Sequence, residues 1–447
     1  MDDLSGDAED AVRLVRGMLR RGEGGEAFRE RRRVLSWTVS EAGLLAPSLS
    51  EERGTAVRIR GERVALLVAR EGDGPEAIRE CVREASRRSG ASPFFKAAHR
   101  AAAGAPAGPH GEEDERFATL LAGALSRALP DPRGLSLSLT VSRVQSARAV
   151  IGPRGAFPCG AAARVAASGI LRRQERQRPF AFQSSRPLPA ALDELATALA
   201  AAARPVPSVP PPTGEVDVVL SPSAASVFWH EVVGHALEAE ATEGASALAR
   251  VRGAAVAPRG VFVRDDPGRA DLPGAYRFDD EGVPGRPVPL LVDGAVGELL
   301  TDRTTGGAAS NGHGRTPDFR RFPRARLSNL VVSPGKVPLD ELLSRCGTGL
   351  LVREVSSGGA DPESGRFVLS VESAELIRRG RASTPVSPFV LAGEVLQALA
   401  SVDPELGDTS APGSGLSLCV KSGEPLPVGG ASPAMIVRGL LARVPRR

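Results

Sequence analysis

The segment HEVVGH, residues His230 to His235, dominates the interpretation of this chain, because two of its five histidines lie here with a carboxylate between them. Neutral imidazoles bind Zn²⁺, and a neighbouring glutamate can accept a proton from water at such a site. The spacing is HExxxH, one residue longer than the common HExxH zinc motif. Residues five apart diverge on a regular α-helix. Both histidines can therefore meet one metal only if the helix contains a π-type turn or unwinds near Gly234.

The flanking residues predict a short strand followed by a buried helix. The stretch EVDVVL (Glu215–Leu220) alternates like a strand, Ser221 can cap a helix, and Pro222 suits the first helical position. Apolar residues then continue at helical spacing, which places the histidines about two turns into the helix. A second interpretation stays open at this point: core hydrogen bonds could satisfy both histidines, with Glu231 contacting His235.

A catalytic zinc site needs a third protein ligand and keeps one position for water. The candidates are Glu238, one turn after His235, and one of the four cysteines. No CxxC pair occurs, which excludes a zinc ribbon and a thioredoxin motif. Cys81 lies in a predicted helix and Cys346 follows a helical run. Cys419 lies in the strand-like stretch LSLCV ahead of a Gly/Pro-rich loop, a common place for functional groups.

The stretches HEVVGHALEAE (residues 230–240) and CVKSGEPLPVGG (residues 419–430) together resemble the TldD/PmbA family, and within it the TldD-type metallopeptidases. Four further stretches match in the order that the family has them: Phe278–Arg303, Ser310–Arg315, Pro323–Lys336 and Ser364–Arg381. The resemblance is dense over about residues 213–435. Ordered matches over this length are far more specific than one six-residue motif.

The resemblance implies that His230, His235 and Cys419 bind zinc and that Glu231 is the general base. It also implies hydrolysis of extended or unfolded peptides, such as antitoxin-like proteins or precursor peptides, in a cleft inside a dimer. The dimer partner would be a second copy or a related family chain. The alternative is a catalytically silent scaffold subunit, against which the complete set of motif residues argues.

Two arginines and one glycine-rich segment are secondary candidates. Arg315 and Arg324 could hold substrate carbonyls or a terminal carboxylate. The segment Thr304–Arg315, which includes His313, is expected to form a flexible loop over the zinc cleft. The competing interpretation of the two arginines is that they are surface residues of an arginine-rich chain.

The composition of the chain indicates which class of protein to expect. The 447 residues are 42% hydrophobic and 25% charged, as in soluble globular proteins. A net charge of +4 is small for this length, so we expect no direct nucleic-acid binding. The first residues are acidic, no run of 18 apolar residues occurs, and the cysteines show no pairing pattern. We therefore expect a cytoplasmic protein without a membrane segment.

A proline-dense stretch divides the chain. We predict an N-terminal α+β domain over residues 1–204, a proline-rich linker over 205–213, and a C-terminal metallopeptidase domain over 214–447 that carries HExxxH and the distal cysteine. The fold class is α+β, with two domains, mainly antiparallel sheets, flanking helices and many short strands in the second domain. Expected elements are a hairpin at 55–60 and 63–68, a strand pair within 136–151, and helices near 75–88, 114–129, 188–203, 221–241 and 388–401.

Overall fold

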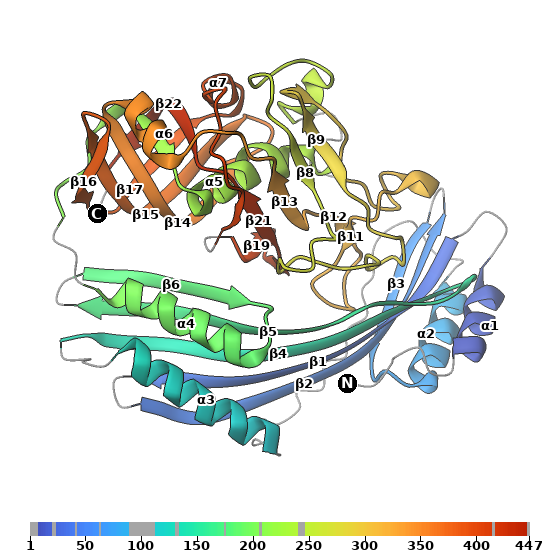
Figure 1. Cartoon of the computed structure of the whole chain (residues 1–447). Coiled ribbons are helices and arrows are strands. Elements are labelled where there is room, and N and C mark those ends of the chain that lie inside the picture. Colours follow the sequence, from blue (N-terminus) through green and yellow to red (C-terminus); the bar gives the residue numbers. More distant parts are fainter. Residues whose placement is uncertain are drawn as a thin grey trace.

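The computed structural model shows a long curved sheet built from the N-terminal half of the chain, with a more compact C-terminal half lying against one of its faces (Figure 1). None of the described helices combines the length and the apolar character that crossing a membrane requires. The structure describes residues 8–19, 24–40, 43–61, 64–88, 112–129, 134–173, 176–204, 208–239, 246–413 and 416–444.

The N-terminal sheet has six antiparallel strands in the order β3-β2-β1-β4-β5-β6. Their bounds are β1 (Gly24–Ser40), β2 (Gly43–Gly61), β3 (Val64–Glu71), β4 (Ser136–Gly152), β5 (Gly155–Arg173) and β6 (Arg176–Ser184). The predicted hairpin is the β2–β3 pair, in which Val57 lies opposite Val68. The strand pair predicted within 136–151 is wrong, because these residues form the single 17-residue strand β4. Buried and exposed residues alternate only over residues 136–141, and the strand continues because β1 and β5 pair with it on both sides as far as Ile151.

Four helices cover two separate areas of this sheet. They are α1 (Ala8–Met18), α2 (Pro75–Arg88), α3 (Glu112–Ala128) and α4 (Leu188–Ala203). Helices α1 and α2 pack on one end through Val15 and Ile78, whereas α3 and α4 pack on the other through Leu121 and Leu195. Figure 1 shows these pairs at opposite ends of the curved sheet. The predicted helices near 75–88, 114–129 and 188–203 are confirmed.

The C-terminal half contains a second six-stranded sheet in the order β14-β7-β22-β17-β15-β16. Its strands are β7 (Gly214–Leu220), β14 (Gly349–Asp361), β15 (Arg366–Arg378), β16 (Arg381–Val386), β17 (Phe389–Glu394) and β22 (Met435–Arg443). Strand β14 pairs with both β7 and β15, which closes five of the strands into a ring. Helix α5 (Pro222–Trp229) packs in the core beside the ring, where Phe228 meets Phe367 edge-on at 5.7 Å between ring centroids.

The remaining strands are short, as predicted for this half. A mixed sheet has the order β10-β9-β8-β13-β21-β18, and two hairpins pair β11 with β12 and β19 with β20. The bounds are β8 (Val263–Asp265), β9 (Val288–Val292), β10 (Ala295–Val296), β11 (Gly314–Arg315), β12 (Arg324–Ala325), β13 (Asn329–Val332), β18 (Ala411–Pro412), β19 (Leu418–Lys421), β20 (Glu424–Pro427) and β21 (Gly429–Ser432). Helices α6 (Leu339–Cys346) and α7 (Val395–Ala400) complete this half. The α+β class with mainly antiparallel sheets is confirmed.

The helix predicted near 388–401 is only half correct. Residues Phe389–Glu394 form strand β17, and the helix α7 starts at Val395. Short apolar runs do not distinguish a strand from a buried helix by themselves. Pairing of β17 with both β15 and β22 decides the outcome, because it satisfies the backbone hydrogen bonds of this segment on both sides.

Charged side chains in the middle of the N-terminal sheet bind loops of the C-terminal half. Arg58 donates to the carbonyl of Asp280 at 2.7 Å, and Arg148 donates to the carbonyl of Thr316 at 3.0 Å. Glu30 accepts from the backbone N–H of Phe319 at 3.0 Å. These contacts connect the N-terminal and C-terminal halves. They also supply hydrogen-bond partners to backbone groups of the C-terminal loops.

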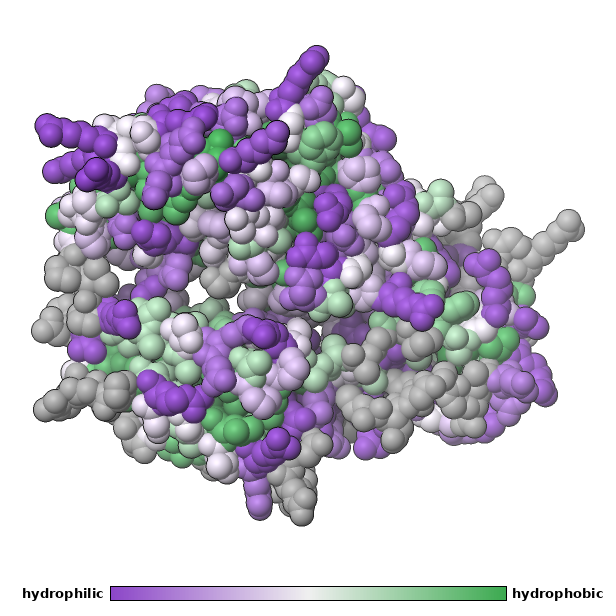
Figure 2. Space-filling view, in the orientation of Figure 1, coloured by the Kyte–Doolittle hydropathy of each residue, from purple (hydrophilic) through white to green (hydrophobic). Residues whose placement is uncertain are grey.

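The described part of the linker lies extended against the C-terminal sheet. Val209 forms a parallel bridge with Val386, and its N–H donates to the carbonyl of Pro385 at 3.0 Å. In the space-filling view, hydrophobic surface occurs as separate patches among hydrophilic residues (Figure 2). The division of the chain into domains at residues 205–213 stays a prediction.

Candidate metal centre

The HExxxH segment contains a π-helical turn, one of the two backbone forms that would let both histidines meet one metal. The side-chain oxygen of Ser221 accepts from the N–H of Ala224 at 3.3 Å and begins α5. The helix then continues into a π-helical turn over His230–Gly234 and ends in a 3-10 turn over His235–Leu237. Within the π turn the N–H of His235 donates to the carbonyl of His230, five residues earlier. The widened turn places the two imidazoles side by side, with ring centroids 4.7 Å apart.

A close packing contact explains the glycine in this turn. A Cβ atom at Gly234 would stand 2.6 Å from a methyl group of Leu327. Any larger residue at position 234 would have to displace that buried leucine. The absence of a side chain at Gly234 therefore allows the π turn to pack against the segment that follows β12.

Cys419 reaches the histidines from the other end of the C-terminal half. It lies on β19, buried, and its Sγ is 3.4 Å from Nε2 of His235. One ligand atom each from His230, His235 and Cys419 lie within 4.8 Å of one another. The other three cysteines are buried elsewhere in the fold. The structure thus brings together the three residues named as metal ligands.

The donor set fits zinc. Two imidazole nitrogens and one thiolate are typical zinc ligands, with bonds of roughly 2.0–2.3 Å. Three atoms within 4.8 Å of one another need little movement to reach such bonds. The Nδ1 atom of His230 is buried and has no hydrogen-bond partner among the residues that the structure describes. A buried polar atom without a partner is costly, so this ring still needs a contact that an ion or a water would supply.

A cavity of about 440 Å³ opens onto these residues and onto Glu231. Its wall is formed by the π turn, by Ser356–Ala360 of β14 and by the strand β19. Glu231 is largely buried beneath it, with 7% of its surface exposed. A larger cavity of about 610 Å³ lies between the start of β1 and the loops near Glu281 and Arg303, and none of the candidate ligands lines it.

The surroundings favour the thiolate form of Cys419. Burial alone would disfavour the charge, but the adjacent His230 and His235 lower the pKa of Cys419 to about 4. By contrast, burial raises the pKa of Cys81 to about 12 and that of Cys346 to about 11. Metals and alkylating reagents both react with the thiolate, so only Cys419 among these three is poised for either.

Glu238 contacts the site without joining the three candidate ligands. Its Oε2 atom lies 3.1 Å from Nδ1 of His235, on the opposite side of the ring from the nitrogen that faces Cys419. Lys421 donates to the same oxygen at 2.7 Å. The sequence offers Glu238 as a candidate third ligand. In the structure its carboxylate contacts Nδ1 of His235, so its position is that of a hydrogen-bond partner of this ring. Sequence reasoning missed Lys421, although its spacing of two from Cys419 on a strand places both on one face.

The two arginines named as substrate contacts do not line the cavity. Arg315 is buried and donates to the carbonyls of Leu327 and, at 2.7 Å, Pro427. It thereby connects the segment behind the π turn with the end of β20. Arg324 lies exposed on β12. Their contact with substrate stays a prediction that these positions do not support.

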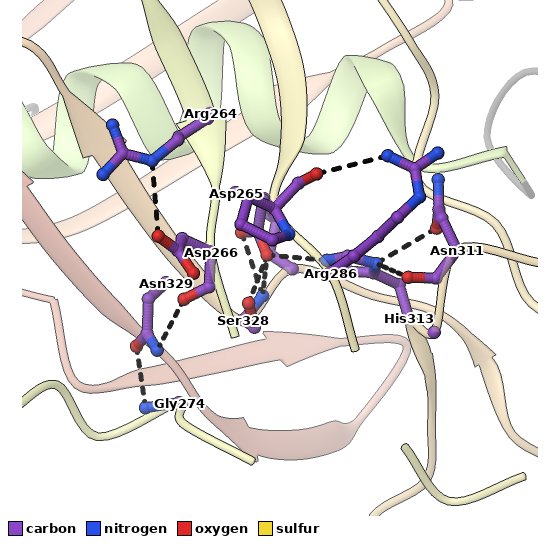
Figure 3. Close-up of polar contacts among 12 residues, drawn as sticks. Arg264, Asp265, Asp266, Gly274, Arg286, Asn311, His313, Ser328 and Asn329 are labelled. Carbon is purple, nitrogen blue, oxygen red and sulfur yellow. Dashed lines mark hydrogen bonds and ion pairs between the residues drawn. The ribbon is translucent and has the colours of Figure 1, made fainter. Parts of the chain in front are cut away.

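The segment around His313 is a buried structural element and does not cover the cleft, so the flexible loop predicted there is wrong for residues 311–315. Figure 3 shows His313 directed at Asp265, with Nε2 at 2.9 Å from the carboxylate. The same carboxylate accepts from the N–H of Ser328 at 3.0 Å, and Asn311 lies 3.0 Å from Nδ1 of His313. His313, Asp265 and Ser328 are all fully buried, so hydrogen bonding fixes this segment in place.

Comparison with known proteins points to one family. Residues 213–442 match the PmbA/TldA metallopeptidase C-terminal domain. A protein named metalloprotease from Methanothermobacter thermautotrophicus is 34% identical over 236 residues, which are 52% of this chain and 51% of that protein. A protein named zinc metalloprotease TldD homolog from Saccharolobus solfataricus is 28% identical over 236 residues, 52% of each chain. The chain spans about half the length of the curated relatives it matches.

The fold is similar over a longer range than the sequence. The crystal structure of TldE from Thermococcus kodakarensis superposes with a TM-score of 0.73 and covers 97% of this chain and 99% of that one. The two sequences are only 19% identical, so this likeness concerns the fold alone. It extends the structural similarity to the N-terminal half.

Proposed function

The chain belongs to the PmbA/TldD metallopeptidase family, and from the geometry of its candidate metal centre we propose that it is a zinc-dependent peptidase that hydrolyses extended or unfolded peptides. The observation that carries the proposal is the convergence of His230, His235 and Cys419 on one point, in the wall of a cavity that Glu231 also lines. A metal site beside a buried carboxylate and an open cavity is what hydrolysis by activated water requires.

His230, His235 and Cys419 would hold the zinc ion, which when bound lowers the pKa of water and polarises a carbonyl oxygen. Glu231 accepts one proton from the attacking water as the new C–O bond forms. It then donates that proton to the leaving amine nitrogen as the C–N bond breaks. The side chain suits this role because it lines the cavity and lies outside the set of ligands.

The edge of β14 supports an extended peptide as the substrate. Pairing of β14 with β7 ends at Val352, and no described strand pairs with that edge from Arg353 to Asp361. The cavity wall Ser356–Ala360 is part of this free edge. A peptide added there as a strand would bind through its main chain and pass beside Glu231, with little demand on its sequence. Antitoxin-like proteins and precursor peptides are substrates of this kind.

We also propose that the chain works in a dimer, with a second copy or with a related family chain. This part of the proposal rests on the family membership and on the fold shared with TldE. A dimer could close the open side of the cavity around an unfolded substrate, which would exclude folded proteins. The net charge of +4 gives no support for direct nucleic-acid binding.

The test is the variant Glu231→Gln, which keeps the size of the side chain and removes its basicity. We expect retained zinc and retained binding of an unstructured peptide, with turnover reduced by roughly 10²–10⁴-fold, the usual contribution of general acid–base catalysis. Glu363→Gln, at an exposed glutamate beyond β14, is the matched control and should cleave at the wild-type rate.

Two results would contradict the proposal. Wild-type turnover in Glu231→Gln would remove Glu231 as the base. Absence of cleavage by the wild-type protein, alone and with a related family chain, would favour the catalytically silent scaffold.

A further inference from the structure

Glu238 is a fully buried carboxylate that touches both elements of the metal centre. It follows the 3-10 turn that begins at His235, and its side chain has no exposed surface. One oxygen, Oε1, accepts from the N–H of Leu327 at 3.0 Å. The other, Oε2, lies 3.1 Å from Nδ1 of His235 and accepts from Lys421 at 2.7 Å. These partners offset the cost of burying the carboxylate.

Lys421 brings the cysteine-bearing hairpin into this contact. Side chains alternate along β19, so Lys421 and Cys419 point to the same face of the strand. That face meets the π turn, because Cys419 approaches His235 and Lys421 approaches Glu238. The Glu238–Lys421 ion pair therefore connects the same two elements as the contact between His235 and Cys419, namely the helical segment and the β19–β20 hairpin.

Arg326 adds a second cation on the other side of Glu238. It is buried, and its Nε lies 3.7 Å from Oε1 of Glu238. Its Nη2 donates toward Sγ of Cys419 at 3.5 Å and toward the carbonyl of Glu424 at 3.3 Å. One buried arginine thus contacts both the carboxylate behind His235 and both strands of the hairpin that carries Cys419.

Side-chain contacts, and not a wider sheet, connect the hairpin to the rest of the described structure. Strands β19 and β20 pair only with each other among the described strands. A two-stranded hairpin is only marginally stable in water on its own. Each contact between the hairpin and the π turn lowers the freedom that Cys419 would have to lose when an ion binds.

We propose that Glu238 and Lys421 are positioning residues of the metal centre: their ion pair locks the hairpin ligand Cys419 against the helix ligand His235, so that the zinc site is formed before the ion binds. The proposal rests on the proposed zinc-dependent function. Glu238 also fixes the orientation of the His235 ring by contacting the nitrogen that does not face Cys419. Carboxylates behind ligating histidines act in this way in other metal sites.

The experiment measures zinc affinity by competition with a chromophoric chelator, using the full-length protein. Lys421→Met removes the charge and replaces the lysine with an unbranched side chain of similar length. The Lys421 ammonium contacts Glu238 and none of the candidate ligands in the described structure. We expect about 10–100-fold weaker zinc binding for this variant and for Glu238→Gln, the usual loss on removing such a contact. Lys421→Arg keeps the charge and should restore most of the affinity.

Lys336→Met is the matched control, because Lys336 is an exposed lysine in the loop before α6. It should bind zinc with wild-type affinity. The double variant Glu238→Gln/Lys421→Met should lose little more than either single variant, since both remove the same contact. Cobalt-substituted Lys421→Met should show an altered visible spectrum, which a general loss of stability would not produce.

Wild-type zinc affinity in Lys421→Met would overturn this inference, and so would fully additive losses in the double variant. Either result with normal zinc binding and peptide cleavage by the wild-type protein would leave the proposed function intact. Absence of zinc binding by the wild-type protein would overturn both.

Discussion

The backbone of Gly358 on β14 lies directly against the side chain of Glu231 on the π turn. A Cβ atom at Gly358 would stand 2.5 Å from Cγ of Glu231 and 2.8 Å from its Oε1. Non-bonded contacts of a Cβ atom below 3.0 Å essentially never occur, so a side chain at position 358 would force Glu231 to move. The next residue differs: a Cβ at Gly359 would meet only Val368, at 4.0 Å. The free edge of β14 and the candidate base are therefore in contact at one glycine.

This contact predicts a difference between two neighbouring substitutions. Gly358→Ala should displace Glu231 and lower kcat by roughly 10–100-fold, because a shift of about 1 Å at a reacting group has effects of this size. Gly359→Ala should retain nearly the wild-type rate. Steady-state cleavage of an unstructured peptide, with zinc content measured in parallel, distinguishes the two. Equal activity of both variants would show that Glu231 does not need its present position.

The ligand set predicts the metal content of purified protein. We expect about one zinc per chain, as a site with three protein ligands requires. His235→Ala and Cys419→Ala should each empty the site while leaving the far-ultraviolet circular dichroism spectrum nearly unchanged, and His230→Ala should lose both metal and activity. Elemental analysis of the dialysed proteins measures the zinc. Full zinc occupancy in Cys419→Ala would remove this residue from the ligand set.

The environment of Cys419 predicts selective alkylation of the zinc-free protein. Its pKa is lowered to about 4, whereas burial holds the pKa values of Cys81 and Cys346 at about 12 and about 11. At pH 6.5 iodoacetamide should therefore modify Cys419 first, and added zinc should prevent the reaction because the same thiolate binds the metal. Peptide mapping by mass spectrometry identifies the site. Labelling of Cys419 at equal rates with and without zinc would argue against ligation.

An apolar rim beside the metal centre predicts a side-chain preference. Leu418 and Val420 point away from the face that carries Cys419, are 46% and 62% exposed, and line the cavity. Partial burial of one valine by substrate is equivalent to about 1 kcal/mol. Val420→Ser should lower kcat/KM for peptides with a bulky apolar residue near the cleaved bond by roughly fivefold.

A peptide with small residues at those positions should be cleaved by Val420→Ser nearly as by the wild-type protein. Val444→Ser, at a valine of similar exposure beyond the end of β22, is the matched control. A uniform loss for both peptides would indicate that Val420 supports the structure and does not select substrates.

Glu281 predicts a dependence of stability on pH. Burial, with the nearby carboxylates of Glu26 and Asp279, raises the pKa of Glu281 to about 8 despite its ion pair with Arg60 at 2.7 Å. The folded state then binds this proton more tightly than the unfolded state does. Its contribution to stability is complete below the unfolded pKa of about 4.5 and is lost as pH rises through about 8.

We therefore expect the Tm of the wild-type protein to fall between pH 6 and pH 9, and the fall to be smaller in Glu281→Gln. Glu298→Gln, at a half-exposed glutamate paired with Arg286, should retain the wild-type dependence. Differential scanning fluorimetry measures both. A Tm of Glu281→Gln that falls as steeply as the wild-type value would assign the dependence to other groups.

Local features of the fold could be predicted because a few neighbouring residues determine them. Ser221 and Pro222 begin α5 as their capping chemistry predicts. The helices α2, α3 and α4 follow the periodicity of their apolar residues. The segment Phe389–Glu394 shows the limit, since an apolar run fits a strand or a helix until the strands beside it are known.

The candidate site could be predicted in part. The HExxxH spacing indicated that both histidines could meet one metal only through a π turn or an unwinding near Gly234, and a π turn is present at His230–Gly234. The residues alone left Glu238 and the cysteines open as the third ligand, and only the family resemblance selected Cys419. The places of Arg326 and His313 had no local signal, because each is defined by partners far away in the chain.

The sequence by itself determined the chemistry available to this protein: two imidazoles and a carboxylate on one helix, with a turn that must widen for both rings to meet one metal. Only the tertiary structure shows that Cys419, 184 residues after His235, lies with its Sγ 3.4 Å from Nε2 of that histidine, and that Glu238 lies behind the same ring, 3.1 Å from Nδ1. The physical reason is the range of the forces involved. Capping and helical spacing act over a few residues, whereas the meeting of the π turn with the β19–β20 hairpin depends on how the whole C-terminal half packs.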